Sequence, residues 1–208
     1  MTTRRNFVAG TAAAASSLMF PLVGRAQPAP VKVGVLHPVT GWATYSGTQC
    51  RLGALLAIED INNAGGIKSL GGAKLEAVLA DAQSKPEVGV AEIERLNSAG
   101  VSAVVGAYAS AICLATTQAA AKYDLPHVVD IGVADSIVQR GLKNTFRFGP
   151  GYKTVADLAV ENLNSLNTAA GKPIKSALII HEESLFGTGT AGLLSKALPG
   201  MGIEVREV

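Results

Sequence analysis

The residues around Ser110 have the types and spacing of an anion site built from backbone groups. Ser110 follows an apolar segment, Val101 to Gly106, that is typical of a buried strand, and it begins a helical segment that runs to about Tyr123. A serine at a helix start can accept a backbone N–H, and the helix end offers further N–H donors and a positive dipole end. These groups can hold a carboxylate without any cationic side chain. Plain capping by Ser110 is the alternative. Tyr108 is expected either to line the same pocket or to pack in the core.

A second segment, Gly187 to Gly192, has the G-x-G-x-x-G spacing of a dinucleotide-binding turn, and Glu207 lies near the end of the strand expected after it. This pattern would suit an exported NAD-dependent enzyme. However, residues 182–186 separate the first glycine from the preceding strand, so the tight turn that the motif requires is missing. We therefore keep the NAD-dependent enzyme only as a third alternative.

Other catalytic patterns are incomplete. His181 to Leu185 begins like the zinc-protease motif H-E-x-x-H, but its fifth residue is leucine, so the second histidine ligand is lacking. His37 and His127 stand alone at the ends of predicted strands. The sequence contains no nucleophile elbow, no C-x-x-C pair and no phosphate-binding loop. It therefore predicts a protein that is not an enzyme, with no catalytic residues, no metal site and no cofactor.

Strands and helices alternate along the chain, which predicts an α/β protein with a doubly wound parallel sheet. The first buried strand, Val31 to Leu36, is followed by a turn-rich loop, His37 to Gly47, and then by a helix. The apolar residues of this helix are spaced for one buried face: Leu52, Leu55, Leu56, Ile58 and Ile61. Further strands are expected at Lys74–Asp81, Val101–Gly106, Pro126–Asp130, Thr145–Phe148, Lys175–His181 and Ile203–Val208. Further helices are expected at Pro86–Asn97, Ser110–Tyr123, Tyr152–Asn167 and Phe186–Leu198.

Residues 1–26 have the pattern of an export signal that is removed after about Ala26. Arg4 and Arg5 form a twin-arginine pair, an alanine-rich apolar segment follows, and small residues precede the expected cleavage point. The arginine pair favours the twin-arginine route, and an ordinary Sec signal is the alternative. The whole chain has 18 basic and 16 acidic residues, so removing three arginines with the signal changes the net charge from +2 to −1. This balance, with no basic stripe, indicates no nucleic-acid partner.

The strand VKVGVLHPVTG, the YSG of the next loop and the helix GALLAIEDINNAGGI together resemble the start of type I periplasmic binding proteins, in the leucine/isoleucine/valine-binding branch. The resemblance covers Val31 to Val208, about the first half of a family member. It implies two lobes with a ligand between them. Phe146-Arg147 matches the pair at which the family leaves the first lobe. The expected division is therefore a first lobe at 31–147 and the beginning of a second lobe at 148–208.

The resemblance also implies ligand-binding positions. Tyr45 matches a loop aromatic that packs on the ligand side chain, Ser110 matches the family's serine, and Phe186 matches an aromatic of the second lobe. Ile131 and Val133 belong to a loop that presents backbone groups to the ligand's head. Relatives often carry threonine or serine at the position of Val133. Valine keeps the N–H but lacks the hydroxyl, which leaves room for a carboxylate ligand without an ammonium group.

The two cysteines, Cys50 and Cys113, do not match the disulfide that branched-chain amino acid binders often have near the cleft. The family positions correspond to Gln83 and Ala109. An exported protein can form disulfides, but we favour two free thiols here.

The function that the resemblance implies is the periplasmic substrate-binding component of an ABC importer. Its expected ligand is a branched-chain amino acid or a related small carboxylate or amide. Its expected protein partners are an inner-membrane permease and the associated ATPase. A ligand-sensing receptor module of the same fold, for amides or small acids, is the second hypothesis.

Overall fold

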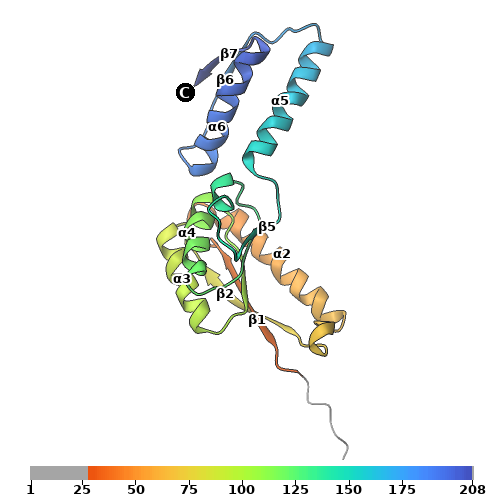
Figure 1. Ribbon diagram of the computed structural model, residues 1–208, viewed down its shortest axis with the longest axis vertical. Coiled ribbons are helices and arrows are strands. Elements are labelled where there is room, and N and C mark those ends of the chain that lie inside the picture. Colours follow the sequence, from red (N-terminus) through yellow and green to blue (C-terminus); the bar gives the residue numbers. More distant parts are fainter. Residues whose placement is uncertain (1–27, 208) are drawn as a thin grey trace, which may run out of the picture.

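The computed structural model describes residues 28–207, so the expected export signal lies outside the described residues. The described chain forms two parts, which Figure 1 shows one above the other. One part contains a five-stranded sheet and the other a two-stranded sheet, and a short segment between β5 and α5 joins them. We call residues 28–147 the first unit and residues 152–207 the second unit.

The first unit is built on a parallel sheet with the strand order β2-β1-β3-β4-β5. Going along the chain, β2 is added on one side of β1, whereas β3, β4 and β5 are added on the other side. This reversal of the strand order makes the sheet doubly wound, as the sequence predicts. In such sheets the crevice at the carboxyl ends of the strands beside the reversal is where ligands bind. The strands are β1 (Val31–His37), β2 (Leu75–Asp81), β3 (Ala103–Gly106), β4 (His127–Val129) and β5 (Thr145–Arg147).

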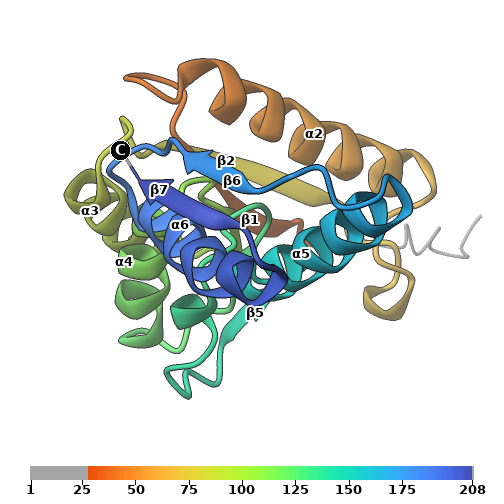
Figure 2. The ribbon, with the colours of Figure 1, turned by 90° about the horizontal axis from the view of Figure 1, so that it is seen from above.

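Helices cover both faces of this sheet. Figure 2 shows α2 on one side of β1 and β2, with α3 and α4 on the other side. Apolar side chains from α3, α4 and the strands form the main core, in which Leu36, Ile93 and Ile112 are almost completely buried. The helical segments are α2 (Thr44–Asn63), α3 (Pro86–Ser98) and α4 (Ser110–Ala121), with short 3₁₀ turns η1 (Lys68–Leu70) and η2 (Asp135–Ile137).

The expectation that α2 buries one apolar face is wrong in this structure. Leu52 is 54% exposed, Leu56 58% and Ile61 42%, and Leu55 and Ile58 are only partly buried. The helical spacing is correct, but the main packing partners of α2 are β1 and β2. Spacing fixes which residues share a helix face, whereas burial needs a neighbour on that face. Within the described residues, nothing covers this side of α2.

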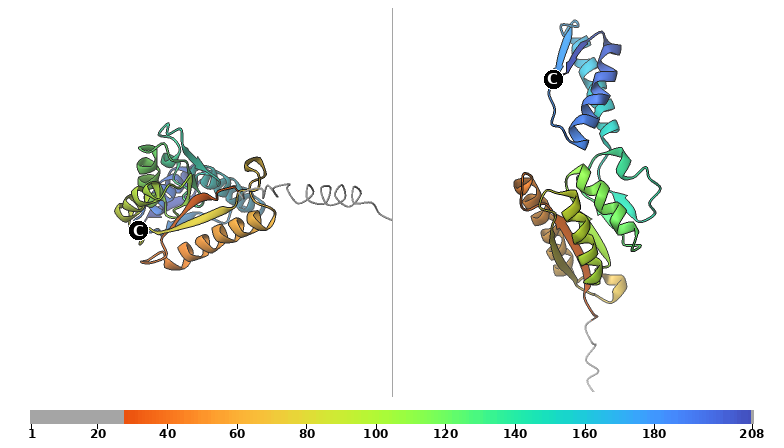
Figure 3. Two further views of the ribbon diagram at one scale, coloured as in Figure 1. Left: turned by 90° about the horizontal axis from the view of Figure 1, so that it is seen from below. Right: turned by 90° about the vertical axis from the view of Figure 1, so that its left-hand side faces the viewer.

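The second unit consists of two helices and a two-stranded parallel sheet, as Figure 3 shows at right. Its elements are α5 (Tyr152–Ala169), β6 (Ser176–Ile179), α6 (Leu185–Ala197), η3 (Leu198–Met201) and β7 (Glu204–Glu207). None of the helices among residues 28–207 is both long and apolar enough to cross a membrane.

The glycine motif of the second unit has a packing role. Gly187, Gly189 and Gly192 lie inside α6 and not in a turn before it. A Cβ on Gly187 would lie 2.3 Å from the carbonyl oxygen of Glu182, and one on Gly189 would lie 2.8 Å from the ring of Tyr152. The first two glycines therefore allow α6 to approach its own preceding loop and α5, which accounts for them without a dinucleotide.

Candidate functional site

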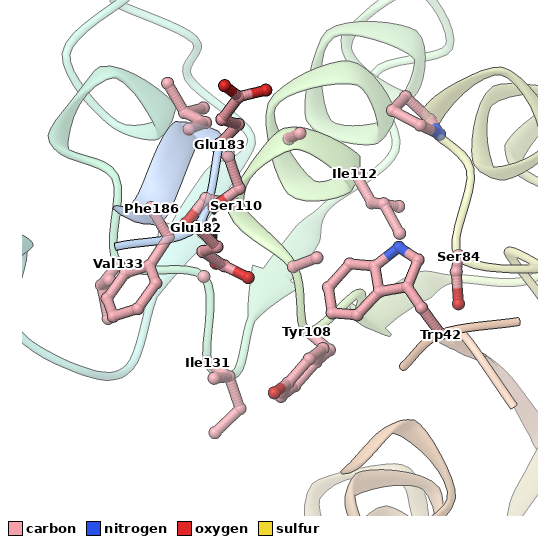
Figure 4. A pocket seen from close by; sticks show the side chains of 16 residues that line it. Trp42, Ser84, Tyr108, Ser110, Ile112, Ile131, Val133, Glu182, Glu183 and Phe186 are labelled. Atoms are coloured by element: carbon pink, nitrogen blue, oxygen red, sulfur yellow. Dashed lines mark hydrogen bonds between the residues drawn. The ribbon is translucent and has the colours of Figure 1, made fainter. Parts of the chain in front are cut away.

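A cavity of about 850 Å³ lies between the two units. On the first unit its lining comes from the loops that follow β1, β2, β3 and β4, and β1 and β3 flank the reversal of the strand order. Figure 4 shows Phe186 and Val133 at one side of the cavity, Trp42 and Ser84 at the other, and Tyr108 and Ile131 between them. Lysine, arginine and histidine are absent from its described lining. The lining residues are Trp42, Ser84, Pro86, Tyr108–Ile112, Ile131–Val133 and Glu182–Phe186.

The N-terminus of α4 forms the middle of the first-unit wall. Helix geometry leaves its first N–H groups without acceptors inside the helix, and no side chain caps them. The expectation that Ser110 caps α4 is wrong, because the cap position is Ala109. Ser110 is nearly buried, and its Oγ accepts the N–H of Ala134 at 3.2 Å. Its hydroxyl proton can still donate to a ligand, so the wall offers several donors to an anion.

Arg147, at the end of β5, anchors the loop that carries Val133. Its guanidinium donates to the carbonyl oxygens of Val133 at 3.1 Å and of Ala134 at 2.9 Å. It also pairs with Asp135 at 3.4 Å, and its side chain is only 9% exposed. The Val133 carbonyl further accepts the N–H of Tyr152, the first residue of α5. These contacts tie the pocket loop to the segment that leads into the second unit.

Asp81, at the end of β2, holds the loop that carries Trp42. Its carboxylate accepts the N–H of Val39 at 3.0 Å, the hydroxyl of Thr40 at 2.7 Å and the N–H of Gln83 at 2.8 Å. Partial burial acts to raise the pKa of Asp81, but these hydrogen bonds outweigh it and hold the pKa below its ordinary value. The loops after β1 and β2 are thereby joined beside the cavity.

The second-unit wall is the loop before α6 together with the first turn of that helix. Ser184 caps α6, with its Oγ accepting the N–H of Gly187 at 3.0 Å, and its hydroxyl donates to Glu182 at 2.6 Å. Glu182 and Glu183 are exposed, and Phe186 is 47% exposed. In Figure 4 the Glu182 carboxylate lies among the drawn side chains, whereas that of Glu183 lies at their edge.

Five of the six expected site residues line the cavity: Tyr108, Ser110, Ile131, Val133 and Phe186. Tyr45 is absent from the lining. It was expected in the loop, but α2 already begins at Thr44, and Tyr45 in the first turn is 80% exposed. Binding by any of these residues stays a prediction.

Trp42 is the aromatic residue of this loop that lines the cavity, and sequence reasoning missed it. The available signal was the only tryptophan of the chain, in the first loop at the carboxyl edge of the sheet.

Both cysteines are free thiols. Cys113 is completely buried behind the cavity wall, and its Sγ accepts the N–H of Ala107 at 3.3 Å. Burial raises the pKa of Cys113 to about 12, so this thiol is unreactive at neutral pH. The described residues contain no group of three side chains that could hold a metal ion.

The sequence profile of the family described as periplasmic binding protein matches residues 30–208. The chain belongs to this family. Leu/Ile/Val-binding protein homolog 8 of Brucella abortus is 34% identical over 168 residues, which are 79% of this chain and 41% of that protein. The chain thus spans about two fifths of the length of this curated relative. The family consists of binding proteins, which agrees with the prediction that the chain is not an enzyme.

Solved structures share the fold. A solute-binding protein of an ABC transporter from Rhodopseudomonas palustris, in complex with benzoate, matches with a TM-score of 0.71 and 20% identity over 86% of this chain and 47% of its own. A branched-chain amino acid transporter substrate-binding protein from Streptococcus pneumoniae, in complex with isoleucine, matches with a TM-score of 0.68 and 23% identity over 86% of this chain and 49% of its own. The fold predicted from the sequence is confirmed.

Proposed function

We propose that this protein is the extracytoplasmic substrate-binding component of an ABC importer. The two units act as lobes that hold a small carboxylate ligand, a branched-chain amino acid or a related acid or amide, in the cavity between them. The observation that carries this proposal is the uncapped N-terminus of α4 beside Ser110, in a cavity lined from both units without a basic side chain. Such a wall suits one carboxylate, which the backbone N–H groups and the helix dipole stabilise.

The remainder of the cavity suits an apolar ligand body. Trp42, Tyr108, Ile131, Val133 and Phe186 supply aromatic and aliphatic surface. This supports either an aliphatic amino acid or an aromatic acid, the two kinds of ligand present in the structures of the relatives from S. pneumoniae and R. palustris. Glu182 offers a partner for an ammonium group, whereas Val133 lacks the hydroxyl that would add a polar contact. The two ligand classes therefore differ in their dependence on Glu182.

We propose that ligand binding brings the two units together around residues 148–151. This segment is the connection between β5 and α5, and Phe148 within it is 90% exposed. Closure buries the ligand and excludes water, which strengthens its polar contacts. The closed form is then recognised by an inner-membrane permease that an ATPase drives.

Calorimetric titration of the full-length mature protein with leucine, isoleucine, valine, benzoate and NAD tests the ligand class. Binding of an aliphatic amino acid that Glu182→Gln weakens supports an amino-acid receptor. Binding of benzoate that is insensitive to Glu182→Gln supports an aromatic-acid receptor. Binding of NAD alone, with none of the acids, contradicts the proposal.

We further propose a periplasmic location, reached with the signal at residues 1–26. Replacing Arg4 and Arg5 together by lysine should leave the precursor uncleaved if export follows the twin-arginine route. Normal cleavage of that double variant would indicate the Sec route. Immunoblotting of periplasmic and cytoplasmic fractions distinguishes the two results.

A further inference from the structure

A histidine–aspartate pair lies directly behind the first-unit wall of the cavity, with the aspartate side chain 21% exposed. His37 ends β1 and is completely buried, and Asp130 follows β4. The Nε2 atom of His37 lies 2.8 Å from Oδ2 of Asp130. In the sheet, β3 lies between β1 and β4, so this contact passes across the carboxyl end of β3. Gly106 lies at that end, and a Cβ there would be 1.8 Å from the carbonyl oxygen of Leu36.

The other oxygen of Asp130 joins the two loops that form the wall. Oδ1 accepts the N–H of Ile131 at 2.8 Å and the N–H of Tyr108 at 3.3 Å. Tyr108 belongs to the loop between β3 and α4, and Ile131 to the loop after β4. Both residues line the cavity, whereas neither Asp130 nor His37 does. One carboxylate therefore fixes two wall segments from behind, without reaching the cavity itself.

Tyr108 needs such an anchor. Its φ is +67°, the left-handed conformation that bulky residues rarely adopt and that persists only when the surroundings hold it. The N–H of this strained residue is one of the two that Asp130 accepts. Because Ser110 and the first N–H groups of α4 follow directly, the direction of the Tyr108 backbone decides where the donors of α4 point.

The carboxylate is charged under ordinary conditions. Burial acts to raise the pKa of Asp130, but the hydrogen bonds from His37, Ile131 and Tyr108 outweigh it, and the pKa lies below its usual value. A charged acceptor makes stronger hydrogen bonds to N–H groups than a neutral one does.

We propose that Asp130, supported by His37, is a positioning residue that sets the backbone of both wall loops in the ligand-binding arrangement without touching the ligand. The proposal rests on the proposed function for its effect on affinity. Its effect on the loops is independent of any ligand. The two effects are therefore measured separately.

The first measurement is amide hydrogen exchange at Tyr108 and Ile131 in the full-length protein, by NMR. Asp130→Ala removes the oxygen that accepts both N–H groups, and exchange at these two amides should become at least about tenfold faster, the loss of roughly one hydrogen bond's stabilisation. Asp130→Asn keeps an acceptor oxygen and should stay within about threefold of the wild type. Asp60→Ala, on the exposed side of α2, is the matched control and should change neither amide.

The second measurement is the Kd for leucine and for benzoate in the same variants, well below their melting temperatures. Asp130→Ala should raise the Kd at least about tenfold for whichever ligand the wild type binds. Asp130→Asn should keep most of the wild-type affinity. If Asp130→Ala does not fold, His37→Ala and His37→Gln replace it, since glutamine can still donate to Asp130. The alanine variant should then show the larger effect.

The outcomes test the positioning role of Asp130 separately from the proposed ligand class. Unchanged exchange at Tyr108 and Ile131 in Asp130→Ala overturns the positioning role, and so does faster exchange with an unchanged Kd, which would make the pair purely structural. If the wild type binds neither probe, the proposed ligand class fails, and the exchange data alone decide whether Asp130 fixes the two loops.

Discussion

The two walls of the cavity differ in how they are held. The first-unit wall is anchored from behind by buried or half-buried groups, among them Asp130, Arg147 and the Sγ of Cys113. The described hydrogen bonds of the second-unit wall are local, within the segment 181–190, and centre on Ser184. A wall fixed by the core of its unit can hold donors at set positions. The second-unit wall is carried by α6, and its Leu185 packs against the core of the first unit.

Under the proposed function, we expect the first wall to recognise the polar head of a ligand and the second wall to cover its body. The difference also implies that changes behind the first wall disturb the protein more than changes at the second. Four measurements test this contrast, beginning with the largest expected effect.

Arg147→Ala should lower the free energy of unfolding by about 3 kcal/mol, because it removes the buried guanidinium that donates to the carbonyl oxygens of Val133, Ala134 and Gly149 and pairs with the Asp135 carboxylate. Arg95→Ala is the matched control, since Arg95 also bonds a carbonyl oxygen and a carboxylate but lies at the surface. Arg95→Ala should lower the free energy of unfolding by less than about 1 kcal/mol. Urea denaturation measures both. Equal losses of unfolding free energy in the two variants would show that Arg147 anchors the wall no more strongly than a surface arginine does.

Acidification should destabilise the first unit through His127, which lies in β4 and is completely buried. Burial lowers the pKa of His127 to about 4, so the folded protein resists a proton that the unfolded chain accepts near pH 6.5. Stability should therefore fall as pH decreases from 6.5 toward 4, by about 2 kcal/mol between pH 7 and pH 5. The variant His127→Gln should show a flatter dependence over this interval. If stability depended on pH in the same way in the wild type and in His127→Gln, His127 would not be the group that makes acid destabilise the protein.

Ser110→Ala should weaken binding of the preferred acid about tenfold, because it removes the hydroxyl donor and the acceptor of the Ala134 N–H together. Ser102→Ala, at an exposed position of the same unit, should leave the Kd unchanged. Calorimetric titration provides both values. A Kd unaffected by Ser110→Ala would place the polar head of the ligand elsewhere.

The smallest effect is expected in the second unit, where Gly189→Ala and Gly192→Ala form a pair on one helix. Alanine has a higher helix propensity than glycine, and a Cβ on Gly192 meets no atom within 4 Å. The free energy of unfolding of Gly192→Ala should therefore rise by about 0.5–1 kcal/mol. The free energy of unfolding of Gly189→Ala should be about 1 kcal/mol lower than that of Gly192→Ala, because the Cβ at position 189 meets the Tyr152 ring. Thermal unfolding compares them. Equal stabilities would mean that α5 and α6 are loosely packed.

Much of the fold could be predicted because apolar runs and glycine turns mark the elements directly. The expected segment Pro86–Asn97 became α3, Pro86–Ser98, and the strand expected at Thr145–Phe148 became β5, Thr145–Arg147. The exposure of α2 could not be predicted in this way, since it depends on what lies beside the helix in space.

The site was only partly predictable. The loops at the carboxyl edge of the sheet could be found, because the strand-to-helix order places them there. The partners of individual side chains could not. Asp130 resembles a solvated turn residue in the sequence, and only the sheet order brings it to His37, 93 positions earlier. Ser110 has the pattern of a cap, yet the nearby N–H of Ala134 takes its oxygen.

The position of Trp42 has a practical consequence. This chain contains a single tryptophan, and its indole lines the cavity while remaining 66% exposed. Its fluorescence emission therefore comes from one place, at the rim between the units. Under the proposed closure, approach of the second unit would remove water from the indole and shift the emission toward the blue, which would make Trp42 an optical reporter of occupancy.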